Sequence, residues 1–395
     1  MPILFLVVLL DAAGFGIIIP VFLYYALQLG AAPEQATMFF SIYPIAIILS
    51  SPLLGRLSDR LGRKPVLLVT LLLACGGYLL LGLAHSLWML GLARFVQGAM
   101  AGNMSVVQAY VADISDDAGR AKAMGKIGAA TALGFVIGPA VGAWLGGSSF
   151  ANTQLEVAAY VSAASLLIAF IAVLFLLPES LSAEQQAKSR ELPFRFNPFA
   201  YVPKALATPL LREFILCAFL FNIAGAFAEV ILPLWLKDKA LINGPSGLTY
   251  MFLCAGLVLA FTQARLIAPV AKRFGENLML RFGALGYGSG FILITLMGAM
   301  NFYPGVIAAW CISGASMAFF FTGLQSLASK CAAPHERGQV MGAFSAVGTI
   351  GRVIGPALTG LLYVNLHANA PFYLGALLLL GVVLVSVKLG KPLEN

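Results

Sequence analysis

Four ionisable side chains lie inside long apolar runs, where a charge is costly. Asp11 stands in "VVLLDAAGFGIIIPVF" (residues 7–22), and Arg94, Glu229 and Arg352 lie in three other runs of this kind. Each costs roughly 2.5–3.5 kcal/mol at the centre of a bilayer on insertion scales, so such groups usually face a cavity and have a function. A carboxyl group in such a cavity can take up a proton from one side of the membrane and release it to the other. We expect Asp11 to be the first candidate for such a proton carrier and Glu229 the second. Two structural ion pairs are the alternative.

Polar residues accompany two of these charges at helical spacing. At about 100° per residue, Gln97 and Gln108 fall within about 60° of Arg94, and Asn222 precedes Glu229 by two helical turns. Stripes of this kind are typical of helices that line a polar cavity. The residues that we expect to line a substrate cavity are Phe15, Arg94, Gln97, Gln108, Asn222, Gln325 and Arg352.

The composition is that of a protein that crosses a membrane many times. Of 395 residues, 60% are hydrophobic and 10% are charged, against about 25% charged residues in a soluble domain. Apolar stretches of about 20 residues recur along the chain and lack the alternation of a barrel, so they predict transmembrane helices. The first begins at once and is too long for the apolar core of a cleavable signal peptide. The expected spans are 3–30, 36–55, 65–84, 88–113, 122–147, 155–177, 211–237, 246–268, 278–299, 304–330, 338–363 and 370–388.

The sequence lacks the signature motifs of several classes of protein. The chain has no GxxxxGK[ST] motif, no HExxH and no nucleophile elbow, so we expect neither direct drive by ATP nor an enzyme activity. The five cysteines stand apart without a CxxC pair, so we expect no disulfide framework, metal site or cofactor.

The distribution of positive charge predicts the topology. Of the 24 Lys and Arg residues, Arg94 and Arg352 lie within spans, 20 fall on one side of the membrane, and only Lys237 and Lys239 fall on the other. The positive-inside rule then places both termini in the cytoplasm of a multi-pass protein of the inner (plasma) membrane. The net charge of +8 therefore reflects topology and contact with membrane lipids, and we expect no nucleic acid partner.

The two halves of the chain repeat. "RAKAMGKIGAATALGFVIGPAVG" (120–142) aligns without gaps to "RGQVMGAFSAVGTIGRVIGPALT" (337–359), with ten identical positions. Parallel repeats of six helices predict two bundles with a transport site near the midplane. The expected parts are an N-terminal bundle (1–177), a cytoplasmic linker (178–210) and a C-terminal bundle (211–395). The aromatic and basic end of the linker is either an interfacial segment or a plain connection.

A short loop between the second and third spans, "GRLSDRLGRK" (55–64), carries an acid and two glycines among its basic residues. Asp59 and Arg63 are four residues apart and pair if the turn is helical. The segment resembles the signature loop of the major facilitator superfamily, G-x-x-x-D-R-x-G-R-[KR]. The matching residues are Gly55, Asp59, Arg60, Gly62, Arg63 and Lys64. The resemblance implies a gate on the cytoplasmic side, with Asp113 and Arg120 as further members.

Three further segments resemble the drug:proton antiporters of this superfamily, in particular the tetracycline-efflux group. They are "LDAAGFGIIIP" (10–20), "RFVQG" (94–98) and "GFVIGPAVGAWLGG" (134–147). The last contains a G-x-x-x-G-P-x-x-G motif, which lets helices pack closely and bend. The residues expected at such a hinge are Gly134, Gly138, Pro139 and Gly142, and in the second half Gly355 and Pro356.

The combined prediction is an all-α protein of twelve transmembrane helices in two six-helix bundles. The resemblance implies a monomeric secondary transporter that exports small, mostly hydrophobic compounds in exchange for protons by alternating access. The chain lacks acids that the tetracycline group carries in its third span and second half, and has Glu229 and Arg352 instead. Transport of a lipid, siderophore, sugar or organic anion is therefore the alternative, and a transceptor that moves nothing is the less favoured one.

Overall fold

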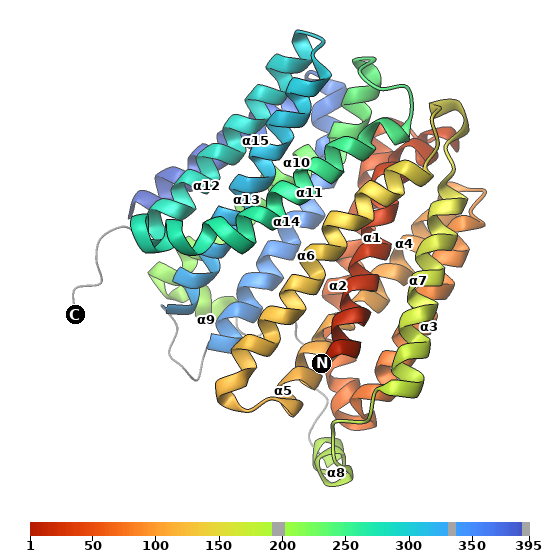
Figure 1. The fold of residues 1–395 in the computed structure, drawn as a ribbon, viewed down its shortest axis with the longest axis vertical. Coiled ribbons are helices and arrows are strands. Elements are labelled where there is room, and N and C mark those ends of the chain that lie inside the picture. Colours follow the sequence, from red (N-terminus) through yellow and green to blue (C-terminus); the bar gives the residue numbers. More distant parts are fainter. Residues whose placement is uncertain (192–201, 331–336, 389–395) are drawn as a thin grey trace. The chain divides into compact units, whose positions relative to one another are not determined.

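The computed structural model describes residues 1–191, 202–330 and 337–388. Every regular element within these ranges is a helix (Figure 1). Tertiary contacts divide the chain into two compact units. Unit 1 comprises Met1–Ala31, Ile42–Pro198 and Gly244–Thr249, and unit 2 comprises Ala32–Ser41, Phe199–Asn243 and Tyr250–Asn395.

Unit 1 is built from the first half of the chain. Within it α1 packs against α6 and α7, and α3 packs against α4 and α7. Its elements are α1 (Pro2–Gln28), most of α2 (Pro33–Leu61), α3 (Arg63–Gly82), α4 (Leu87–Ala101), α5 (Met104–Ile114), α6 (Asp117–Leu145), η1 (Phe150–Asn152), α7 (Leu155–Leu176), α8 (Ala183–Glu191) and η2 (Pro245–Leu248).

Unit 2 repeats this arrangement with the second half. Helix α10 packs against α14 and α15, and α12 packs against α13 and α15. Its elements are α9 (Val202–Ala207), α10 (Pro209–Asp238), α11 (Thr249–Phe261), the π-helical turn η3 (Thr262–Leu266), α12 (Ile267–Ala299), α13 (Tyr303–Lys330), α14 (Arg337–Asn365) and α15 (Ala370–Lys388).

The predicted twelve-helix fold is confirmed. Nine helical stretches among the described residues are long and apolar enough to cross a membrane, and a shorter tenth covers Ala370–Ser386. One of the nine, Pro245–Ala299, is interrupted at Gly275 (φ 78°, ψ 162°) and holds two spans. The pair α4 and α5 supplies the twelfth, since the expected single span 88–113 is broken at Gly102 and Asn103.

The linker is partly helical. The polar stretch Ala183–Glu191 forms α8, and Val202–Ala207 forms the short α9. Most of the aromatic and basic stretch, residues 192–201, lies outside the described residues, so its placement at the membrane surface remains a prediction.

The same glycines join matching helices in the two units. A Cβ at Gly134 on α6 would lie 2.8 Å from the Leu9 carbonyl oxygen on α1, and a Cβ at Gly351 on α14 would lie 2.9 Å from the Phe219 carbonyl oxygen on α10. Only glycine allows backbones to approach this closely. Leu9 and Phe219 are 210 positions apart. Each residue of α10 therefore corresponds to the residue of α1 that lies 210 positions earlier in the chain.

Candidate transport site

Asp11 lies on one face of α1, whose other faces are held by packing. Gly138 on α6 approaches the Ala13 backbone, and Ser162 on α7 donates a hydrogen bond to the Gly14 carbonyl oxygen at 3.1 Å. The Asp11 side chain is partly exposed and has no hydrogen bond or ion pair among the described residues. A carboxylate with no basic partner in an apolar helix is the arrangement expected of a group that titrates during function.

A tyrosine from α3 lies close to this carboxylate, and the sequence analysis missed it. The Tyr78 hydroxyl would be 3.7 Å from a Cβ at Gly14, one turn along α1 from Asp11. Tyr78 is buried and within electrostatic range of Asp11, Tyr43 and Arg94. The only sequence signal was a tyrosine in an apolar span, which does not distinguish a cavity from ordinary packing.

Arg94 is enclosed by aromatic rings and has no contact with Asp11. Its side chain is 1% exposed, and its guanidinium carbon lies 5.3 Å from the ring centres of Phe15 and Phe22 and 4.6 Å from that of Tyr43. Asp11, Phe15 and Phe22 share one face of α1 at helical spacing. The two rings lie four and eleven residues beyond Asp11, roughly 6 and 16 Å along the axis, which explains the separation of the two charges.

The structure brings together the first two residues of the polar stripe expected on the fourth span, Arg94 and Gln97. Arg94 donates to the Gln97 side-chain oxygen at 3.1 Å, and Gln97 donates to the Gly77 carbonyl oxygen at 3.2 Å. Gln108 is exposed and makes no hydrogen bond with the described residues. The break after Gly102 ends the regular rotation on which the predicted stripe depended.

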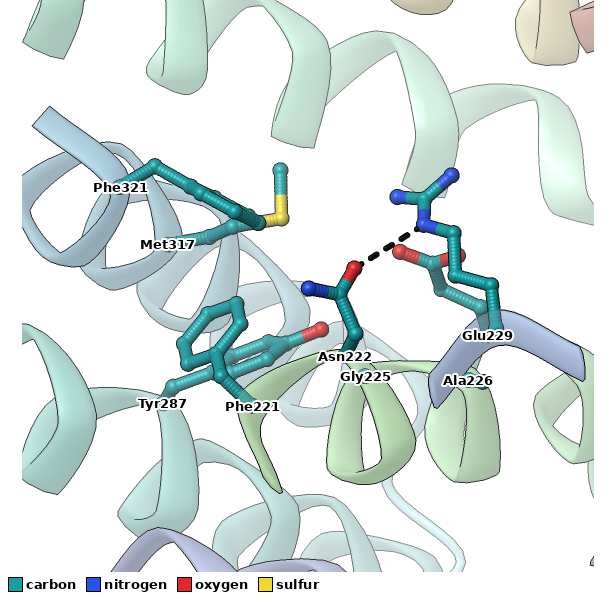
Figure 2. A pocket seen from close by; sticks show the side chains of 9 residues that line it. Phe221, Asn222, Gly225, Ala226, Glu229, Tyr287, Met317 and Phe321 are labelled. Atoms are coloured by element: carbon teal, nitrogen blue, oxygen red, sulfur yellow. Dashed lines mark hydrogen bonds between the residues drawn. The ribbon is translucent and has the colours of Figure 1, made fainter. Parts of the chain in front are cut away.

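In unit 2 the predicted residues Asn222, Glu229 and Arg352 meet in one small cavity (Figure 2). It has about 10 Å³ open to the centre of a water molecule, which is room for about one water. The complete lining is Phe221, Asn222, Gly225, Ala226, Glu229, Tyr287, Met317, Phe321 and Arg352. Three of the polar side chains therefore face an aromatic wall, and Tyr287 adds a hydroxyl that the sequence analysis did not foresee.

Arg352 uses one nitrogen to hold Asn222 and does not form an ion pair with Glu229. Its Nε donates to Asn222 Oδ1 at 3.2 Å, and Asn222 Nδ2 donates to the Ala218 carbonyl oxygen at 2.8 Å. The Glu229 carboxylate lies within electrostatic range of the guanidinium but outside salt-bridge contact. Gln325, predicted as a cavity residue, is exposed on α13 and is not in the lining.

The segment 55–64, expected as a loop, consists of the end of α2, Gly62 and the start of α3, and it forms the Asp59–Arg63 ion pair that its spacing predicts. Arg63 binds Asp59 at 2.6 Å and Asp113 at 3.0 Å, and it also donates to Ser58 Oγ at 2.7 Å. Arg63 is buried, whereas the Asp59 side chain is 45% exposed. Gly62 has φ 101°, a conformation that residues other than glycine rarely adopt. The charges of this loop are therefore fixed around one buried arginine.

Glu179 caps the start of α3, which the sequence analysis missed. Its two carboxylate oxygens accept hydrogen bonds from the backbone N–H groups of Arg63 at 2.9 Å and Lys64 at 3.0 Å. A carboxylate at a helix N-terminus interacts favourably with the unpaired N–H groups and the helix dipole. The sequence signal was an acid directly after the apolar run and proline that end the sixth span, "LLPES".

Further residues of the expected gate lie near the start of α3. Lys64 donates from Nζ to the Leu174 carbonyl oxygen at 2.9 Å, and the Arg60 carbonyl oxygen accepts from Arg190 Nε at 3.0 Å. Gly55 faces Ser105, whose Oγ would lie 3.5 Å from an added Cβ. Arg120 lies in the first turn of α6, and its part in the gate remains a prediction.

The predicted hinge glycines lie where helices meet. Gly134, Gly138 and Gly142 on α6 face the α1 backbone, and Gly355 on α14 faces Ile223 and Ala226 on α10. Pro139 and Pro356 stand inside α6 and α14. Close packing of these pairs is observed, and hinge movement remains a prediction.

Two parallel repeats of helices and two sets of intramembrane charges define a membrane transport protein of the secondary type. The Major Facilitator Superfamily family model matches residues 4–298 and 243–394. The chain belongs to this superfamily. It is accordingly a multi-pass membrane transporter for small molecules, and its family consists of transporters rather than enzymes.

Relatives with resistance functions align along almost the whole chain. Tetracycline resistance protein, class C, from Escherichia coli is 28% identical over 390 residues, covering 96% of this chain and 93% of that protein. Multidrug resistance protein 2 from Bacillus subtilis (strain 168) is 26% identical over 376 residues, covering 95% and 91%. The expected group within the superfamily is confirmed by these relatives.

Solved structures share the fold. The human organic anion transporter MFSD10 (TETRAN) superimposes with a TM-score of 0.70 at 23% identity and 98% coverage of both chains. The peptide transporter POT in complex with sulfate gives a TM-score of 0.76 at 15% identity, covering 98% of this chain and 93% of that chain. At these identities the likeness establishes the fold alone.

Proposed function

We propose that this protein is a proton-coupled transporter that exports small, mostly hydrophobic compounds by alternating access. The observation that carries the proposal is Asp11, a carboxylate within a membrane-spanning helix that no basic residue neutralises among the described ones. The names of the tetracycline and multidrug resistance relatives support the same class of cargo.

Asp11 acts as the proton carrier, and Arg94 responds to its charge. Among the described residues, aromatic rings and one amide oxygen are the groups that hold the Arg94 guanidinium. This buried cation is poorly compensated, because a desolvated charge normally requires an opposite charge. A change of conformation that shortens the distance to Asp11 favours the ionised carboxylate, and the reverse change favours its protonation. This alternation couples proton release to the movement of the units.

Glu229 is the second proton-binding candidate, and its position in unit 2 is not the one that corresponds to Asp11 in unit 1. By the offset of 210 positions between α1 and α10, Glu229 corresponds to Ile19 and not to Asp11. Eight residues of α1, roughly 12 Å along its axis, separate Asp11 from Ile19, the position that corresponds to Glu229. The two acids are therefore not copies of one site, and we assign them different parts of the transport cycle.

The loop around Arg63 biases the cycle. Asp59 forms part of the gate on the cytoplasmic side, where a carboxylate near a helix N-terminus contributes about 0.3–1 kcal/mol. That amount shifts a balanced two-state equilibrium without locking it. In this proposal the protein is a monomer in the inner (plasma) membrane, with both termini cytoplasmic, lipids around it, and protons and a small molecule as its ligands.

The second candidate function is transport of an organic anion by the same fold. It is favoured by the accessible guanidinium of Arg352 in a cavity that three aromatic rings also line. A lipid, siderophore or sugar as cargo, and a transceptor that transports nothing, have no comparable observation in their support.

Purified protein in proteoliposomes with an internal pH dye tests the proposal. Addition of ethidium or tetracycline against an imposed proton gradient should produce proton movement that depends on the compound. Proton movement that is the same with and without either compound, together with an unchanged resistance spectrum of expressing cells, would contradict proton-coupled drug export.

A further inference from the structure

The Arg352 guanidinium is oriented by its neighbours and has one edge left unused. Asn222 is fixed through its own hydrogen bond to the Ala218 carbonyl oxygen, and its Oδ1 accepts from Arg352 Nε. Neither Nη has a protein partner within the described ranges, and the side chain is exposed. A guanidinium held in this way is prepared to bind a planar anion with two parallel hydrogen bonds.

An apolar wall stands beside this charged edge. Phe221 stacks on Phe320 with ring centres 3.8 Å apart and meets Phe321 edge-on at 4.9 Å. Phe221, Phe321 and Met317 line the cavity together with Arg352. A charged edge next to rigid rings and one adaptable thioether suits the acidic group of an anion with an aromatic body. The cavity has room for about one water, so the body of that molecule lies outside it.

Glu229 sets the net charge of the site. The charged and titratable groups that face it are Arg352 from α14 and Tyr287 from α12; α13 contributes Met317 and Phe321, which do not titrate, and α15 contributes no side chain to the lining. With Glu229 ionised, the two charges cancel. With Glu229 protonated, the site carries one positive charge and attracts an anion.

We propose that this cavity in unit 2 binds the carboxylate of an organic anion through Arg352, with Asn222 as the positioning residue and Glu229 as the group that links binding to proton uptake. This inference rests on the second candidate function, transport of an organic anion, and names the residues that bind the carboxylate of such a substrate. It also predicts that a proton and an anion bind here together, whereas a proton and a cation compete for the site.

Equilibrium binding to the full-length protein in lipid nanodiscs tests this site. The probes are radiolabelled naphthoate and its neutral amide, naphthamide, which share one aromatic body. Wild type should bind naphthoate about tenfold to a hundredfold more tightly, as expected of a charge-assisted bidentate contact. Arg352→Gln should remove the preference, and Arg352→Lys should restore only part of it. Arg265→Gln, an exposed arginine of the same unit, is the control and should keep it.

Asn222→Ala separates positioning from general damage. It should weaken naphthoate binding severalfold and leave naphthamide unchanged, whereas a merely structural role weakens both. Wild-type affinity for naphthoate should rise as the pH falls, and Glu229→Gln should bind up to about tenfold more tightly at neutral pH with a flat profile. Equal binding of acid and amide by wild type, or no saturable binding of naphthoate at millimolar concentration, would overturn the inference.

Different results contradict the anion site and proton-coupled export. Glu156→Gln, at an acid of α7 in unit 1, should bind naphthoate as wild type does, because this residue lies outside the cavity. If wild type discriminates the acid from the amide but moves no protons, the anion site stands and proton-coupled export fails. If proton-coupled transport is present without discrimination, the anion site fails.

Discussion

Arg63 and Glu276 occupy matching places in the two units and carry opposite charges. Each directly follows a glycine in the left-handed region, with φ 101° and 78° respectively. Arg63 pairs with Asp113 at the end of α5 (3.0 Å), and Glu276 pairs with Lys330 at the end of α13 (2.6 Å). The repeat therefore keeps an ion pair between the start of its third span and the end of its fourth, while the polarity is reversed.

The reversed pair predicts rescue by a charge swap. Glu276→Lys and Lys330→Glu should each lower the thermal midpoint, and the double variant should recover most of the loss. Lys330 is 64% exposed, so we expect a coupling energy of only about 0.2–1 kcal/mol. Burial acts to raise the pKa of Glu276, which lies between two spans, but hydrogen bonds from Lys330 and Ser326 outweigh it and lower that pKa below its ordinary value.

The pH dependence of this coupling follows from the lowered pKa. The folded state holds Glu276 in its ionised form. The stabilisation by the Glu276–Lys330 pair is therefore present above the ordinary pKa of a glutamate and is lost as the pH falls through the lowered pKa of Glu276 in the folded state. Double-mutant cycles at neutral and acidic pH check this. A coupling energy that persists after Glu276 is protonated would show that the contact is not ionic.

Asp11→Asn should reduce proton-coupled transport at least tenfold and leave folding intact, since it keeps the shape of the side chain and removes its titratable group. The check is proton flux and substrate efflux in proteoliposomes, with size-exclusion profiles to assess folding. Glu156→Gln, an acid in the first turn of α7, is the control and should transport normally. Efflux at the wild-type rate along a pH gradient in the Asn variant would exclude Asp11 as the carrier.

Asp59→Asn should slow transport severalfold without weakening substrate binding. Asp59 at the end of α2 pairs with Arg63 at the start of α3 and takes no part in either set of intramembrane charges. Turnover is measured in proteoliposomes and affinity in nanodiscs, and Glu191→Gln, an exposed acid of α8, serves as the comparison. The gating role fails if affinity falls while turnover per bound substrate is unchanged.

Glu179→Gln should lower the free energy of unfolding by about 1–2 kcal/mol, because a charged acceptor for two backbone N–H groups at the start of α3 is lost. Glu184→Gln removes an acid of similar sequence position that forms only an exposed pair with Lys188, and it should change stability by less than about 0.5 kcal/mol. Unfolding midpoints in denaturant compare the two. Equal effects would show that the cap contributes little.

The fold was predictable because its signals are local or repeated. Spans are defined by continuous apolar length, and Gly134 and Gly351 stand at the same place in two aligned segments. Close contact of Gly134 with α1 and of Gly351 with α10 follows from the absence of a side chain. The break at Gly102 was not predictable, because a glycine inside an apolar run is compatible with a continuous helix.

The candidate site was predictable only in part. Charges in apolar runs identify Asp11 and Arg352 from composition alone, because their cost demands an explanation. Tyr78 and Glu179 were missed because their roles depend on contacts with residues far along the chain. Gln325 was included because a polar residue in a span suggests a cavity. It is exposed on α13 and outside the lining of the unit 2 cavity, and its part in a substrate cavity stays a prediction.

Glu229 and Arg352 interact through their charges but are not in contact. A buried ion pair that loses one partner costs about 3–5 kcal/mol, so a structural pair would make both single variants unstable. Since Arg352 donates to Asn222 and not to Glu229, we expect Glu229→Gln and Arg352→Gln each to fold, with unfolding free energies lowered by less than about 2 kcal/mol. The double variant should show effects that add to within about 1 kcal/mol.

The two single variants should also differ in transport. Glu229→Gln should lose proton coupling, and Arg352→Gln should lose affinity for an anion. By contrast, Asn222→Ala and Arg352→Gln share a hydrogen bond, and their effects on stability should be non-additive by about 0.5–1.5 kcal/mol. Thermal midpoints of the three single variants and the two doubles, measured in one detergent, give both couplings. Strong coupling of Glu229 to Arg352 with recovery of folding in their double variant would establish a structural ion pair and remove Glu229 from the proton pathway.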